Sequence, residues 1–285
     1  MNSVDPHNDP FKDFTNRLKL LISEHPNLIV TTLSNIFTMR LIGNKTHGDL
    51  AEIAIAEFVN QYMYDFRAVH VGKDLYRAKS QEEDITIRNE KTQVEFPVSL
   101  KAYGVGPLQL STDKDCKMFR RLKQEGKAEI RGRDAVQKVL QDCAFARKIN
   151  VLALIYDEEK QCCNILVFDY DRAITETERI IRVEEGTRGR KHPVYRFCNS
   201  EGVYICEVRY GDATANALQR GLWTHTRHAY EYFDSITSGW ISYSHNQILV
   251  KLFSHALVSS QTGHENALKN IREDIARMKP KSDLG

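Results

Sequence analysis

The sequence predicts an α/β protein of mixed α+β character, in which a central mixed β-sheet is flanked by helices. Two observations lead to this prediction. Through residues 11–170, segments with helical spacing of apolar residues alternate with short runs of β-branched residues, in the order helix, hairpin, helix, strand, strand. From residue 180 onward, short apolar runs follow one another as in a meander, which predicts a β-rich C-terminal elaboration.

The composition is typical of a soluble globular chain: 285 residues, 41% hydrophobic and 27% charged, with a net charge of +2. No apolar run approaches the roughly 18 residues of a membrane span, and residues 1–11 lack the pattern of a secretion signal. The six cysteines include no CxxC pair, so we expect reduced thiols in a cytoplasm and no zinc site. Basic clusters at 117–123 and 188–192 suit either phosphate contacts or a solvated face.

Three helices are expected before the sheet, at residues 11–23, 28–42 and 50–64. The third is apolar on almost all sides, so we expect it to be buried, with Glu52 and Glu57 as interruptions. A buried carboxylate needs a partner, which makes this helix a candidate source of a functional acid. Further helices are expected at 115–124 and 134–148, and two closing helices at 245–258 and 264–278.

A predicted hairpin follows, formed by residues 82–87 and 94–101 around a polar break. Because strand side chains alternate between faces, Phe96, Val98 and Leu100 should point into the core, and Ser99 and Lys101 to the other side. Asp84 opens the first strand at the end where Lys101 closes the second. A carboxylate and a lysine placed together suit a divalent metal beside an activated water, although an ordinary charged hairpin has the same pattern.

Three motifs fall in order along this region: Gly48-x-x-x-Glu52, Glu83-Asp84 and Ser99-Leu100-Lys101. Together they resemble the PD-(D/E)XK nuclease core, over about residues 46–170, and the chain size resembles that of a type II restriction endonuclease. The resemblance implies a restriction-endonuclease-like fold and catalytic residues Asp84, Lys101, Glu52 and Ser99. Asp84 and Glu52 would bind Mg²⁺, and Lys101 would orient the attacking water and offset transition-state charge.

The motif departs from that family at two positions. Glu83 stands where the family often has proline, which is chemically mild. Ser99 stands where the family has a carboxylate, and a hydroxyl is a poor metal ligand. Glu52 is therefore the candidate for the missing acid, with Glu57 as runner-up, because Glu95 lies roughly 13 Å along the strand from Ser99.

Polar side chains outside the hairpin are candidate DNA contacts. Asn and Gln pair with adenine and Arg with guanine in the major groove, so the polar stretch 216–228 is the best candidate for sequence readout; a buried polar turn is the alternative. We expect DNA contacts from Gln109, Ser111, Thr112, Arg188, Arg190, Lys191, Asn216, Gln219, Arg220, Thr224, His225 and Arg227.

The resemblance implies a sequence-specific double-stranded DNA endonuclease of a bacterial or archaeal restriction-modification system, acting in the cytoplasm with Mg²⁺. It would be a homodimer, with a DNA methyltransferase as its functional partner. We expect one domain over residues 1–285, with a catalytic core at 46–170, a recognition elaboration at 180–230 and closing helices at 245–278. The alternative is a catalytically inactive nucleic-acid-binding protein of the same fold. No phosphate loop, nucleophile elbow or dinucleotide motif favours a metabolic α/β enzyme.

Overall fold

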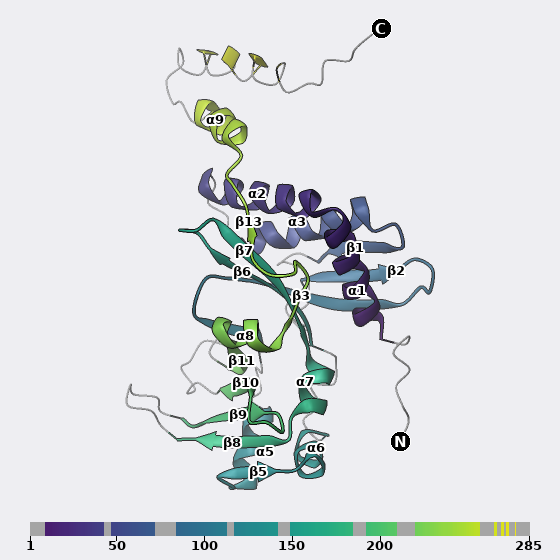
Figure 1. Cartoon of the computed structure of the whole chain (residues 1–285), viewed down its shortest axis with the longest axis vertical. Helices are drawn as coiled ribbons and strands as arrows, with labels where there is room; N and C mark the ends of the chain where they lie inside the picture. The colour runs from purple at the N-terminus through teal and green to yellow at the C-terminus, as the bar shows by residue number, and fades with distance from the viewer. Residues whose placement is uncertain are drawn as a thin grey trace.

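Two β-sheets form the centre of the protein, and three N-terminal helices cover the outer face of the first sheet (Figure 1). The structure is a computed structural model that describes residues 9–42, 47–71, 84–112, 117–141, 149–184, 192–209 and 220–256, with short stretches between 265 and 277. The predicted class, a mixed sheet flanked by helices, is confirmed.

The N-terminal helices are α1 (Pro10–Glu24), α2 (Pro26–Ile42) and α3 (His47–Tyr62), close to the predicted ranges. Asp9 caps α1, because its carboxylate accepts hydrogen bonds from the backbone amides of Phe11 and Lys12. The apolar side of α3 is buried, but Ile53 and Glu57 face solvent. The helix is therefore amphipathic, which corrects the expectation of burial on nearly all sides.

The first sheet has the strand order β1-β2-β3-β6-β7-β12, with β13 also pairing with β7. Its strands are β1 (Phe66–His70), β2 (Ile85–Asn89), β3 (Glu95–Tyr103), β6 (Asn150–Asp157), β7 (Cys162–Asp169), β12 (Asp234–Ser235) and β13 (Ile241–Ser242). β2 and β3 form the predicted antiparallel hairpin, and β3 pairs in parallel with β6. The parallel pair makes the sheet mixed, as expected.

The second sheet is antiparallel, with the order β4-β11-β10-β9-β8-β5. Its strands are β4 (Pro107–Ser111), β5 (Glu129–Arg131), β8 (Arg179–Val183), β9 (Val194–Cys198), β10 (Tyr204–Arg209) and β11 (Gly221–His225). The consecutive strands β8, β9 and β10 are the predicted meander. β4 and β5 come from within residues 46–170, so the expected catalytic core contributes strands to both sheets.

Two apolar cores lie on opposite sides of the first sheet. One contains Phe14 of α1, Leu33 of α2 and Leu100 of β3, between the helices and the sheet. The other contains Val151 of β6 and Val208 of β10, between the two sheets. This arrangement covers β6 and β7 on both faces, which explains their continuous apolar runs.

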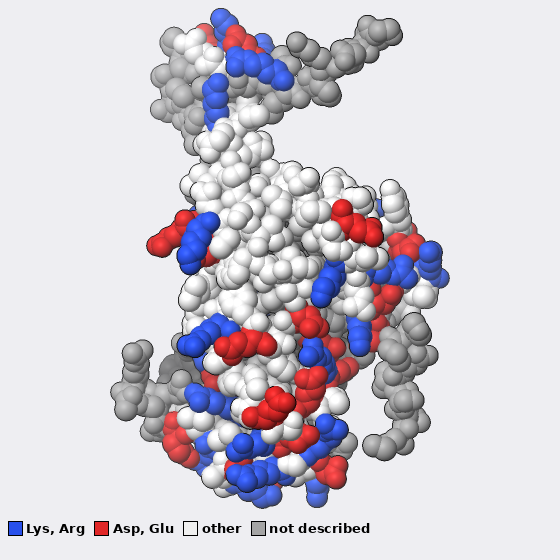
Figure 2. Space-filling model, viewed as in Figure 1, with Lys and Arg blue, Asp and Glu red and all other residues white. Residues whose placement is uncertain are grey.

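The remaining helices are α5 (Lys117–Glu125), α6 (Arg133–Gln141), α7 (Tyr170–Glu176), α8 (Thr226–Tyr232) and α9 (Gln247–Ala256). α9 confirms the first closing helix, and the second, at 264–278, lies largely outside the described residues. None of the helices in the described ranges has the length and hydrophobicity needed to cross a membrane. Figure 2 shows Lys and Arg interspersed with Asp and Glu over the second sheet and its helices. On the same face of the molecule, the region of α2 and β13 carries few charges.

Candidate functional site

Asp84 is the centre of a polar cluster at the beginning of β2. Its Oδ2 accepts a hydrogen bond of 2.8 Å from the Ser99 hydroxyl and one of 2.7 Å from the backbone amide of Leu100. The Lys101 Nζ lies 3.7 Å from the same oxygen. Both of these hydrogen bonds to the Asp84 side chain, which come from described residues, end on Oδ2. They fix the orientation of the carboxylate, whose second oxygen, Oδ1, is a further acceptor.

The hairpin register brings these groups together. Ile85 pairs with Val98, so Asp84 stands across from Ser99, one position beyond that pair. Alternation along β3 buries Val98 and Leu100 in the core below α1–α3, as predicted. Ser99 is also buried, because its hydroxyl is engaged with Asp84. Ser99 therefore orients the carboxylate, a role for which a serine hydroxyl suffices.

Glu52 approaches this cluster from α3. Its side chain is 13% exposed. Burial raises the pKa of Glu52, the negative charge of Asp84 raises it further, and the hydrogen bond with His70 opposes the shift. Two carboxylates are thus close enough to repel each other. Glu57 on the same helix is exposed, so the helix presents Glu52 and not the runner-up to the site.

His70, at the end of β1, belongs to the same cluster and was missed by the sequence analysis. Its Nε2 lies 3.1 Å from Oε2 of Glu52. β1 pairs with β2 so that His70 is opposite Ile85, and the amide of Val71 donates a 3.0 Å hydrogen bond to the Asp84 carbonyl. The spacing Phe66-x-Ala68-x-His70 is the signal that could have identified it, since it places the imidazole on the strand face covered by α3.

The site offers two carboxylates as cation ligands. Across the described ranges, no group of three His, Cys, Asp or Glu side chains is arranged to hold a metal ion; Glu82 and Glu83 lie outside those ranges. Mg²⁺ needs fewer protein ligands than zinc, because it keeps several waters and binds one or two carboxylates together with substrate phosphate oxygens. Asp84 and Glu52 are therefore the carboxylates that would hold a Mg²⁺ ion in this site.

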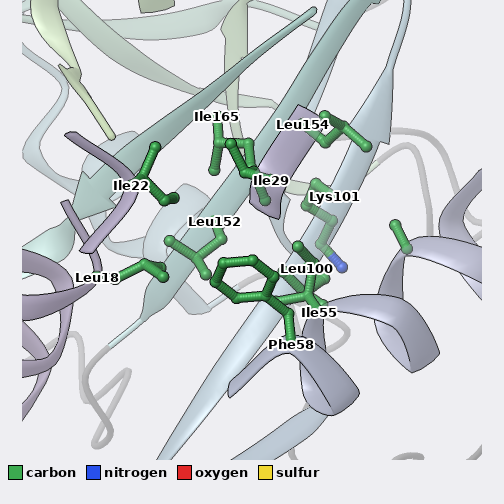
Figure 3. Close-up of a pocket in the computed structure, with 11 residues that line it drawn as sticks. Leu18, Ile22, Ile29, Ile55, Phe58, Leu100, Lys101, Leu152, Leu154 and Ile165 are labelled. Atoms are coloured by element: carbon green, nitrogen blue, oxygen red, sulfur yellow. The ribbon is translucent and has the colours of Figure 1, made fainter. Parts of the chain in front are cut away.

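Lys101 connects the polar cluster with an apolar pocket behind it. The pocket lies between the N-terminal helices and the first sheet, and its lining includes Leu18, Ile29, Phe58 and Leu152 (Figure 3). The Lys101 stem takes part in this lining, and its amine reaches Asp84. An apolar stem packed in this way restricts the position of the ammonium group.

Three expected DNA contacts are buried. Gln109 is 4% exposed and its amide donates a 2.8 Å hydrogen bond to the Arg220 carbonyl. Thr224 is fully buried and its hydroxyl donates to the Ile205 carbonyl, while Ser111 is 3% exposed. The Gln109 and Thr224 side chains thus connect β4, β11 and β10. All three side chains are buried, which contradicts the expectation that they contact DNA.

The other expected contacts have mixed outcomes. Arg227 is exposed on α8, and His225 caps that helix, because its Nδ1 accepts a 3.2 Å hydrogen bond from the Arg227 amide. Thr112 and Arg220 are half-buried. The expected contacts outside the described residues are Arg188, Arg190, Lys191, Asn216 and Gln219.

A second ionic cluster lies on the solvent-side face of the second sheet. Glu207 of β10 is 3% exposed and forms ion pairs with Arg196 of β9, at 3.4 Å, and with Arg209. The Arg209 guanidinium also lies over the Trp223 ring, 5.1 Å from its centroid. Cross-strand pairs put Arg196, Glu207 and Trp223 in one row. The sequence analysis did not identify this cluster, because the row forms only after three strands pair.

No protein-family model, no curated protein and no solved structure matches this chain. The resemblance to the nuclease core therefore depends on this chain's own residues. Among the residues that the resemblance assigned to the site, Glu52, Asp84, Ser99 and Lys101 lie in one cluster. The residues assigned to sequence readout do not form a comparable group within the described ranges.

Proposed function

We propose that this protein is a Mg²⁺-dependent endonuclease that cuts double-stranded DNA at specific sequences, as in a restriction-modification system. The observation that supports the proposal is the Asp84 carboxylate, fixed by Ser99 and the Leu100 amide, with Lys101 at 3.7 Å and Glu52 near enough to repel it. A carboxylate pair beside a single lysine is suited to hydrolysis of a phosphodiester, whose transition state gains negative charge.

Each residue has a defined task in this proposal. Asp84 and Glu52 would hold Mg²⁺, which when bound supplies positive charge to the scissile phosphate. Ser99 fixes the direction of the Asp84 carboxylate through its 2.8 Å hydrogen bond. Lys101 stabilises the charge that develops on the phosphate and orients the attacking water through its ammonium hydrogens. Packing of its stem keeps that group in place between turnovers.

The substrate and assembly are part of the same proposal. Duplex DNA with a two-fold symmetric site would be cut by a homodimer, since one catalytic cluster per chain then serves each strand. The enzyme would act in a bacterial or archaeal cytoplasm, where a methyltransferase of the same specificity protects host DNA. Exposed Arg227, at the beginning of α8, is the described candidate for a DNA contact.

A second candidate function is a nucleic-acid-binding protein that has this fold but no catalysis. The observation that favours it is the serine at position 99, where the nuclease family has a carboxylate. The described residues therefore supply two carboxylates to the site and not three. Binding without cleavage would follow if two carboxylates hold Mg²⁺ too weakly for chemistry.

A digestion experiment separates the two functions. Purified protein is incubated with phage DNA in Mg²⁺ or in EDTA, and a gel-shift assay in Ca²⁺ measures binding to the same DNA. Discrete fragments in Mg²⁺ alone, absent for Asp84→Ala, are expected for the endonuclease. Shifted but uncut DNA would reject the endonuclease and support the binding protein, whereas neither shift nor cleavage would reject both.

A further inference from the structure

We infer that His70 is a positioning residue that holds the Glu52 carboxylate toward Asp84, so that the two acids act as one cation site. This inference rests on the proposed function, since it concerns the same metal site. The imidazole Nε2 lies 3.1 Å from Oε2 of Glu52, and the two side chains are 33% and 13% exposed. An ionised carboxylate can only accept, so the ring donates this hydrogen bond.

The fold fixes His70 from two sides. On one side, β1 is hydrogen-bonded to β2, and the His70–Ile85 pair stands next to Asp84. On the other side, β1 is attached to α3, because the Asn60 amide donates 3.0 Å to the Ala68 carbonyl and accepts 2.8 Å from the Ala68 amide. Ala68 and His70 share a strand face. The imidazole therefore points at α3 from a backbone that cannot slide along the helix.

Glu52 needs such a partner because its neighbour repels it. The negative charge of Asp84 raises the pKa of Glu52, and the Glu52 side chain is only 13% exposed. A glutamate side chain has three rotatable bonds, so without a restraint it would turn toward solvent and away from Asp84. The hydrogen bond from His70 opposes that rotation, which is the role that partners of metal-binding carboxylates have in general.

The matched control is a second histidine–glutamate pair in this chain. On α8, Nδ1 of His228 lies 3.2 Å from Oε2 of Glu231, and these side chains are 39% and 53% exposed. The two pairs are similar in geometry, but no carboxylate of the candidate site contacts the α8 pair in the structure described. A loss specific to His70 would thus report on the site and not on surface ion pairs in general.

Mn²⁺ binding to the full-length protein tests the inference, measured by isothermal titration calorimetry and by the electron paramagnetic resonance signal of free Mn²⁺. We expect His70→Ala to weaken Mn²⁺ affinity by about 10-fold to 100-fold. His70→Gln, whose amide can donate to Glu52, should recover most of that loss, and His228→Ala should leave the affinity unchanged. Cleavage by His70→Ala should rise toward the wild-type rate as Mn²⁺ is increased, which a general structural defect would not allow.

The outcomes distinguish this inference from the function on which it rests. Wild-type protein that neither binds Mn²⁺ nor cuts DNA would overturn the proposed function and the inference together. Wild-type protein that binds and cuts, with His70→Ala binding Mn²⁺ equally well, would overturn the inference alone. If His70→Ala fails to fold by circular dichroism, His70→Gln decides: tight Mn²⁺ binding sustains the inference, and binding as weak as that of Glu52→Gln overturns it.

Discussion

Each of the two sheets of this protein has a cluster in which a carboxylate lies against basic side chains, but the net charges of the two clusters have opposite signs. At the first sheet, Asp84 and the nearby Glu52 of α3 are two acids, and Lys101 is the lysine or arginine that pairs with them among the described residues. In the second sheet, Glu207 carries one negative charge against Arg196 and Arg209. Under the proposed function the first cluster would bind a cation, whereas the carboxylate of the second is paired with arginines of the protein itself.

Burial separates the two clusters as well. The Asp84 and Lys101 side chains are 22% and 23% exposed, so solvent can reach them, as the proposed function requires. The Glu207 side chain is 4% exposed beneath its two arginines. Removing one partner of a buried ion pair leaves the other charge uncompensated, which destabilises the fold. This comparison predicts that substitutions in the first cluster change activity, and that substitutions in the second change stability.

The largest effect is expected at Asp84 and Lys101. Asp84→Asn keeps an oxygen that can accept from Ser99 and Leu100 but removes the charge, and Lys101→Ala removes the only amine in the cluster as described. We expect each to lower the cleavage rate about 10³-fold or more while DNA binding in Ca²⁺ stays largely intact. Plasmid digestion and gel shift measure the two quantities.

Asp157→Asn is the control for that prediction. Asp157, the last residue of β6, is also paired with a lysine: its Oδ2 lies 3.1 Å from Nζ of Lys160 in the turn that leads to β7. Cleavage by Asp157→Asn should match the wild type. Full activity in Asp84→Asn would show that the hairpin is not the catalytic centre.

The two glutamates of α3 give the next effect in size. Glu52 is half-buried beside Asp84 and Glu57 faces solvent, so the same substitution tests two positions of one helix. We expect Glu52→Gln to lower the cleavage rate about 10²-fold or more and Glu57→Gln to leave it within about twofold. Initial rates measured over a Mg²⁺ titration would show the Glu52 defect. The reverse pattern would move the helix carboxylate to Glu57.

The sequence predicted the first cluster well because its geometry is local. Strand alternation and one hairpin bring Asp84 opposite Ser99. Glu52 was nominated by the expected burial of its helix and by the resemblance to the nuclease core. For His70, alternation along β1 indicates the face of the strand, but the pairing of β1 with β2 joins segments separated by residues 72–83, which no local pattern predicts. The second sheet is less local still: Gln109 is bonded to a carbonyl 111 positions along the chain, so its burial follows from strand pairing that no short pattern encodes.

A stability effect is expected at Glu207. Glu207→Gln preserves the side-chain volume but removes the charge that both arginines contact, and charged hydrogen bonds contribute about 1.5–3 kcal/mol. We expect the free energy of unfolding in urea to fall by that amount, with cleavage unchanged when the protein is folded. Glu231→Gln, at an exposed carboxylate on α8, should cost less than about 1 kcal/mol. A Glu207 variant that is stable but inactive would reassign this cluster to the catalytic function.

The smallest effects compare a buried and an exposed residue at the junction of β11 and α8. Thr224→Val removes one hydrogen bond to the Ile205 carbonyl, which we expect to cost about 1 kcal/mol of stability with DNA affinity unchanged. Arg227→Ala should leave stability unchanged but weaken DNA binding and lower the salt dependence by about one phosphate contact. Unfolding curves and binding isotherms at several salt concentrations measure both. A Thr224→Val protein with altered sequence preference would mean that the second sheet rearranges on DNA, because a side chain buried in this way reads no base without movement of β11.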